Sequence, residues 1–107
     1  MKWDTAGISR VYLSGPMTGM PHLNFPAFHA AAARLRGEGY DVVNPAELNP
    51  DATVPWAECM RADIKALCDC DTLALLPGWE NSQGAHLEMH IAHRIGIRVI
   101  TLEKLLP

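Results

Sequence analysis

The chain has 107 residues, of which 49% are hydrophobic and 20% are charged, with a formal net charge of −3. These values are typical of one soluble globular domain, and the charge, without an arginine or lysine cluster, excludes a nucleic-acid polymer as partner. The start, MKWDTAGISR, has no apolar core, so neither a signal peptide nor a membrane span is expected. The three cysteines favour free thiols, as small core or helix-end residues, in a reducing cytoplasmic setting.

Strand-like and helical patterns alternate along the chain. Four short apolar segments, rich in strand-forming residues, are expected to form strands: 10–14, 40–43, 72–76 and 97–102. Three segments with helical periodicity lie between them: 25–36, 55–68 and 81–96. Asn24 and Thr53 are expected to cap the first two helices, and Gly37 and Gly39 to end the first. Residues 48–54 are expected to be loop.

This β-α-β-α-β-α-β order predicts parallel strands joined by right-handed crossovers. The expected fold class is α/β, a flavodoxin-like or Rossmann-like three-layer sandwich with a four- to five-stranded parallel sheet, in a single domain over residues 1–107. Ligands of such sheets bind beyond the carboxyl ends of the strands. The loops expected there are GPMTGM, NPAELNP and PGWENSQG.

Two acidic residues, Asp63 and Glu88, fall on the apolar faces of their predicted helices. Glu88 shares an arc with four apolar residues: Leu87, Ile91, Ala92 and Ile95. Asp63 lies beside an apolar stripe: Trp56, Met60, Ile64 and Leu67. A half-buried carboxylate costs several kcal/mol unless it is paired, neutral or used. Two such groups favour acid/base or nucleophilic chemistry, because burial separates their pKa values. Alternatively, each accepts hydrogen bonds from a helix end or an arginine.

A candidate anion site precedes Glu88. Ser82 and Gly84 place a hydroxyl and free N–H groups at a helix N-terminus, which favours phosphate or another anion. The alternative is that Ser82 or Asn81 is only an N-cap. Glu88 follows six residues after Ser82, roughly 6–9 Å along a helix. That is about the distance from a 5′ group to the anomeric carbon of a pentose. Gly15 either lets the backbone approach a ligand or forms a tight turn.

Four segments together resemble the nucleoside 2-deoxyribosyltransferase superfamily: YLSGP, the helix with Asp63, DTLALL, and Ser82-x-Gly84-x-x-x-Glu88-x-x-x-Ala92. The likeness extends from Tyr12 to about Val99. Its most specific part, residues 78–92, is similar to small phage and bacterial members with a GWENSxGAxxE signature. The resemblance implies a cytoplasmic enzyme that cleaves or transfers at the N-glycosidic bond of nucleosides or their 5′-monophosphates. It also implies no metal or organic cofactor, and a homodimer or larger homo-oligomer.

The resemblance also implies roles for individual residues. Glu88 would be the nucleophile that attacks C1′, Asp63 the acid/base or orienting group, and Asp71 a second acid. Tyr12 and Gly15 would line the sugar and base pocket.

The resemblance further implies that the residue six positions before the nucleophile determines which class of substrate is bound. An acid there would bind the 5′-hydroxyl of a nucleoside, whereas a serine would bind a phosphate, so Ser82 favours a nucleotide. Two features differ from the nucleotide hydrolases. The loop with Trp79 and Glu80 is longer and is expected to reshape or cover the pocket. The chain also ends at Pro107, without the segment through which those hydrolases supply a phosphate ligand to a neighbouring subunit.

A histidine stripe and several loop residues have competing interpretations. His86, His90 and His93 could hold a metal, but they lie on the far side from the apolar arc, so they are expected to be solvated or at a subunit contact. HLEMH does not have the H-E-x-x-H spacing of a zinc protease.

Trp56 and Trp79 could each stack on a nucleobase, but Trp56 lies on an apolar stripe and is expected in the core, whereas Trp79 either has a ligand or interface role or simply packs. Asn44 and Asn49 are expected to shape turns. Three functions stay open: an enzyme acting on an N-glycosidic bond, a non-catalytic nucleotide-binding protein, and a protein that cleaves or binds an NAD derivative.

Overall fold

The computed structural model describes residues 5–107. The first four residues belong to the segment in which no signal peptide is expected, and they lie outside the described residues. Four parallel strands form one sheet in the order β2-β1-β3-β4. Their bounds are β1 Arg10–Ser14, β2 Asp41–Val43, β3 Thr72–Leu75 and β4 Arg98–Thr101. The predicted α/β class and the four-stranded parallel sheet are confirmed.

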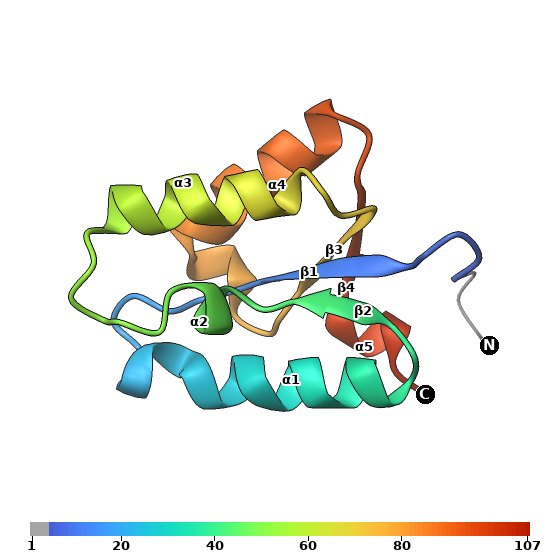
Figure 1. Ribbon diagram of the computed structural model, residues 1–107, viewed down its shortest axis with the longest axis horizontal. Coiled ribbons are helices and arrows are strands. Elements are labelled where there is room, and N and C mark those ends of the chain that lie inside the picture. The colour runs from blue at the N-terminus through green and yellow to red at the C-terminus, as the bar shows by residue number, and fades with distance from the viewer. Residues whose placement is uncertain (1–4) are drawn as a thin grey trace.

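Helices cover both faces of the sheet (Figure 1). On one face lie α1 Phe25–Gly37, α2 Pro45–Leu48 and α5 Leu102–Leu105. On the other lie α3 Trp56–Leu67 and α4 Gln83–Arg94. Two 3-10 turns, η1 Pro21–Asn24 and η2 Trp79–Asn81, precede α1 and α4. Within residues 5–107, no helix is long and apolar enough to cross a membrane.

Alternate residues of β1 face opposite layers, as the pleat of a strand requires. Val11 and Leu13 belong to the core cluster beneath α1 and α5. Tyr12 belongs to the cluster beneath α3 and α4. Ser14, two residues after Tyr12, therefore shares the α3–α4 face, and it is 1% exposed. This alternation decides which β1 side chains can reach α4.

The segment after β2 contains a helix that the sequence interpretation missed. Residues 45–48 form α2, and Asn44 is its N-cap, with Oδ1 accepting a hydrogen bond of 3.0 Å from the N–H of Ala46. An asparagine cap followed by proline at the first helical position is a helix-start signal. The prediction that Asn44 only shapes a turn was therefore wrong, and so was the assignment of Leu48 to a loop.

The predicted caps of the first two long helices were partly wrong. Asn24 is at the N-cap position of α1, as predicted, but its backbone is left-handed (φ 59°) and its side chain donates to the carbonyl of Pro16 instead of capping the helix. The N-cap of α3 is Pro55 and not Thr53, whose hydroxyl donates to the Asp51 carboxylate. Both side chains brace loops at the carboxyl ends of the strands.

The expected apolar faces of α3 and α4 were partly wrong. Trp56 is 49% exposed, Leu87 38% and Ile95 53%. The buried positions of α4 are Ala85, Glu88 and Ala92, and the small side chains of the two alanines let the helix approach the sheet closely. Leu87 lies well around the helix from these positions, and Ile95 lies beyond the end of α4.

Candidate functional site

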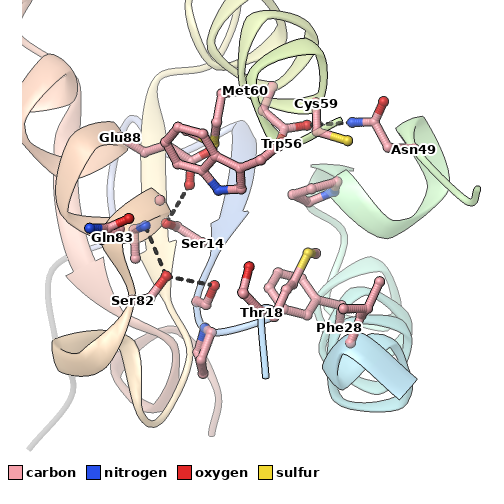
Figure 2. A pocket seen from close by; sticks show the side chains of 18 of the residues that line it. Ser14, Thr18, Phe28, Asn49, Trp56, Cys59, Met60, Ser82, Gln83 and Glu88 are labelled. Atoms are coloured by element: carbon pink, nitrogen blue, oxygen red, sulfur yellow. Dashed lines mark hydrogen bonds between the residues drawn. The ribbon is translucent and has the colours of Figure 1, made fainter. Parts of the chain in front are cut away.

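A cavity of about 590 Å³ opens at the carboxyl ends of β1 and β3 (Figure 2). Its lining comes from the end of β1 and the following loop, the starts of α1 and α4, the segment around α2, and α3. The order β2-β1-β3-β4 places the topological switch point between β1 and β3, where ligands of open α/β sheets bind. The volume lies within the about 300–1,000 Å³ that is usual for small-molecule sites.

Glu88 is the most constrained acidic group of this cavity. Its side chain is 5% exposed, and its carboxylate accepts hydrogen bonds from Tyr12 Oη (2.5 Å) and Ser14 Oγ (2.7 Å). Both donors come from one face of β1. Burial raises the pKa of Glu88 to about 7, while the two hydrogen bonds lower it and the charge of Asp63 raises it. Burial also raises the pKa of Tyr12 well above its usual value, and the Glu88 charge adds to this.

Asp63 is the second buried acid of the cavity, and it comes from α3. Its side chain is 7% exposed, and Oδ1 accepts a hydrogen bond of 2.8 Å from Asn49 Nδ2. Burial raises the pKa of Asp63 to about 6, and the hydrogen bond from Asn49 lowers it. The partners of both acids are thus Tyr12, Ser14 and Asn49, and not the helix end or arginine considered from the sequence. Two carboxylates on separate helices consequently titrate near neutrality within one cavity.

The start of α4 forms another wall of the same cavity. Asn81, Ser82 and Gly84 all line it, together with Gln83. Ser82 is the N-cap: its Oγ accepts from the N–H of Ala85 (3.1 Å) and donates to the carbonyl of Gly15 (3.4 Å). The first N–H groups of a helix have no acceptor within the helix itself. The capping role is confirmed, and an anion beside the remaining N–H groups stays a prediction.

Gly15 lines the cavity, and it also determines how closely the chain after β1 approaches the chain after β3. A Cβ atom at this position would lie 2.8 Å from the Cβ of Leu76, which is closer than real contacts allow. Its glycine identity is therefore explained by packing alone. Gly84 is less restricted, because a Cβ there would meet the flexible end of Met60, with Sδ at 3.4 Å.

Asp71 does not lie in the cavity. It directly precedes β3, at the amino ends of the strands, whereas the cavity lies at their carboxyl ends. Its carboxylate accepts hydrogen bonds from the N–H groups of Ser9 and Arg10 and from the hydroxyl of Thr72. Burial alone would raise the pKa of Asp71, but the hydrogen bonds from Arg10, Thr72 and Ser9 lower it below its usual value. Asp71 therefore joins β1 with β3 and lies outside the proposed site.

Trp79 and His86 form a contact outside the cavity. The ring centroids are 5.5 Å apart, and Trp79 packs against the apolar cluster beneath α3 and α4. His86 Nε2 lies 2.8 Å from the carbonyl oxygen of Glu80. Of the two interpretations for Trp79, the geometry favours packing. Over residues 5–107, no group of three or more His, Cys, Asp or Glu side chains is placed to hold a metal ion.

Three further residues of the site were missed from the sequence. The alternation of β1 could have identified Ser14, because Tyr12 and Ser14 must share a face. Asn49 was expected to shape a turn, yet it follows α2 and donates to Asp63. Trp56 was expected in the core, but it begins α3 beside the cavity and lines it. No sequence pattern places the latter two, because both depend on α2 and α3 being neighbours.

Comparisons with known proteins agree with this fold. Residues 9–101 match the family model described as "Domain of unknown function (DUF4406)". No curated protein shows significant sequence similarity to this chain. Among solved structures, the CMP N-glycosidase BcmB of Clostridium botulinum is similar, with a TM-score of 0.59 and 24% identity. The alignment covers 87% of this chain and 67% of that chain, and it supports the fold.

Proposed function

Because the chain belongs to the DUF4406 family, whose description names no activity, we propose its function from the geometry of the site. The proposed reaction is cleavage or transfer at the N-glycosidic bond of (deoxy)nucleoside 5′-monophosphates or nucleosides, with Glu88 as nucleophile. One observation carries this proposal. A buried glutamate, held by two hydroxyls, shares a nucleotide-sized cavity with a second buried acid, Asp63. Most glycosidases use such a pair of carboxyl groups for displacement at an anomeric carbon.

The proposed reaction has two displacements. A Glu88 oxygen attacks C1′, the C1′–N bond breaks, and its electron pair stays on the departing base. In the second step, water or an acceptor base attacks C1′ and releases the Glu88 carboxylate. Asp63 orients the base and exchanges protons with the leaving group or the attacking water. Tyr12 and Ser14 hold the Glu88 carboxylate in one orientation by their hydrogen bonds.

The 5′ group would lie at the start of α4. Ser82 and Gly84 line the cavity there, and Asn81 precedes them. Free N–H groups and the helix dipole favour a phosphate at such a position. The similar structure from Clostridium botulinum is named a CMP N-glycosidase, which supports a nucleotide as the substrate class.

A second candidate function, a nucleotide-binding protein without turnover, is favoured by one observation. Burial raises the pKa of Glu88 to about 7, so a large part of the carboxyl is protonated near neutral pH. A protonated glutamate is a poor nucleophile.

Chromatographic measurement of free base tests the proposal. Purified protein is incubated with nucleosides and their 5′-monophosphates, with and without an acceptor base. Glu88→Gln is the inactive variant, and Glu58→Gln, which changes an exposed acid of α3 outside the cavity, is the matched control. Base release by wild type and Glu58→Gln, but not by Glu88→Gln, supports the enzyme. Ligand binding by calorimetry without any base release would instead support the binding protein.

A further inference from the structure

The charged residues lining the cavity are all acidic. Asp51, Asp63 and Glu88 line it, and the described lining contains no arginine, lysine or histidine. The two buried acids have only neutral hydrogen-bond donors, namely Tyr12 and Ser14 for Glu88 and Asn49 for Asp63. The negative charge of the cavity is therefore not balanced by any described side chain that lines it.

Asp63 keeps one free acceptor. Oδ1 accepts from Asn49, whereas Oδ2 accepts no hydrogen bond from any residue that the structure describes. The side chain is 7% exposed and lines the cavity. Oδ2 is not among the described buried atoms without a partner, so it is open to the space that a ligand would occupy. A carboxylate oxygen with an unused acceptor position can pair there with a cation or a donor on the ligand.

An aromatic surface lines the same cavity. Trp56 lines the cavity and is 49% exposed, so much of its ring can still contact a ligand. Figure 2 shows Trp56 and Asn49 on the upper side of the cavity and Ser82 at its lower left. An indole that shares a cavity with unbalanced carboxylates is an arrangement that attracts a planar cation. The Ser82 end, with its helix N-terminus, has the opposite electrostatic preference.

From this arrangement we propose that the cavity selects N-glycosides whose base carries a positive charge, such as an N-ribosyl pyridinium. The base would lie between Trp56 and Asp63, with C1′ before Glu88 and the 5′ group near Ser82. This inference rests on the proposed function and specifies its substrate class.

The chemistry of the leaving group agrees with this choice. When a Glu88 oxygen bonds to C1′ and the C1′–N bond breaks, the electron pair neutralises the positive nitrogen. The base then departs uncharged and needs no proton from an acid. Burial raises the pKa of Asp63 to about 6, so this group is mainly ionised at neutral pH and can pair with a cation.

A pair of isosteres tests the charge preference without relying on turnover. 1-Methylnicotinamide is a pyridinium cation, and 3-methylbenzamide is its neutral carbon isostere. Calorimetry should show the cation binding to wild type at least about tenfold more tightly, as expected for a partly enclosed charge against carboxylates and an indole. The preference should fall sharply in Asp63→Asn and persist unchanged in Glu58→Gln, which removes an equal charge outside the cavity.

Trp56→Leu provides a second variant, because an exposed side chain can be changed with little risk to folding. It should weaken binding of the cation more than binding of the neutral isostere. Equal affinity of the two isosteres for wild type, or a preference as large in Asp63→Asn as in wild type, overturns the inference.

Turnover distinguishes this inference from the proposed function. Nicotinamide riboside, with its pyridinium base, is compared with cytidine and CMP, each rate being divided by its uncatalysed rate. Faster normalised release from the pyridinium supports the inference. Faster release from the neutral bases overturns it and leaves the proposed function standing. No release from any of them, with the isostere preference intact, overturns the proposed function and leaves the charge selectivity supported.

Discussion

The hydroxyl of Tyr12 donates a 2.5 Å hydrogen bond to Glu88 Oε2, across 76 positions of sequence. This bond ties the central strand to the helix that carries the proposed nucleophile. Because Tyr12 is fully buried, it sets the environment of Glu88 without itself lining the cavity. The ionisation of Glu88 is therefore adjustable from a position that a substrate does not contact.

Tyr12→Phe should move the pH dependence of catalysis to higher pH. The Tyr12 hydrogen bond lowers the pKa of Glu88, so its loss raises that pKa above about 7. If Glu88 acts as a carboxylate, the acidic limb of the kcat/KM profile should shift upward by about 1 pH unit. Tyr40→Phe, a tyrosine that packs against the opposite cluster, is the control and should leave the limb unchanged. A limb that does not move in Tyr12→Phe would contradict Glu88 as the titrating group.

Glu88→Gln should change the pH dependence of stability. The pKa of Glu88 is about 7 in the folded state against a usual value of 4.5, so the folded protein holds this proton more tightly than the unfolded chain. The stabilisation is fully present below pH 4.5 and is lost as the pH rises to about 7. The loss is on the order of 3 kcal/mol, and glutamine does not titrate.

Urea unfolding at pH 5 and pH 8 measures this difference. The free energy of unfolding of Glu88→Gln should be close to that of wild type at pH 5 and exceed it at pH 8. Asp63→Asn should behave in the same direction, because its pKa is also raised, from 3.8 to about 6. Variants that track wild type at both pH values would show that the two acids are less buried than described.

Ser82→Asp should separate helix capping from anion binding. Aspartate caps helices as well as serine does, so the free energy of unfolding should change little, whereas Ser82→Ala should lose about 1 kcal/mol. If the 5′-phosphate lies at this helix start, the added carboxylate should repel it. The ratio of kcat/KM for a monophosphate to that for its nucleoside should then fall at least about tenfold in Ser82→Asp. An unchanged ratio would place the 5′ group elsewhere.

Gly15→Ala and Gly84→Ala should have opposite effects on stability. A methyl group at position 15 would meet the Cβ of Leu76 at 2.8 Å, so the backbone must shift, at a cost of about 1–3 kcal/mol. At position 84 it would meet only the flexible end of Met60, and alanine favours helix by up to about 1 kcal/mol. Thermal unfolding of the two variants, side by side, checks this. Equal destabilisation would contradict the packing described around Gly15.

The parts of the fold with clear periodicity could be predicted from the sequence. The uniformly apolar β3 and the amphipathic pattern of α3 each identify an element and its type, and the alternation of elements identifies a parallel sheet. The burial of Glu88 was expected from its apolar neighbours, and it holds although two of them, Leu87 and Ile95, are exposed. These features depend on local spacing, which a single sequence contains.

Features that depend on how elements meet could not be predicted. Asp71 resembles a site residue by its place before an apolar strand, yet pairing of β1 with β3 makes it a bridge between two backbones. Trp56 lies on an apolar stripe, but the start of α3 extends beside the cavity, so the indole remains half exposed. In each case the deciding neighbour is distant in sequence.

The pairing of β1 with β3 also divides the protein into two complementary fragments. The first, ending around α2, carries the donors Tyr12, Ser14 and Asn49; the second, beginning at α3, carries the acceptors Asp63 and Glu88. Of the strand pairs described over residues 5–107, only β1 with β3 joins the two fragments. A chain cleaved between α2 and α3 would thus contain every group of the site, but each acid would lack its donor until the fragments reassociate. Fragment complementation and the building of the site are, in this fold, one event.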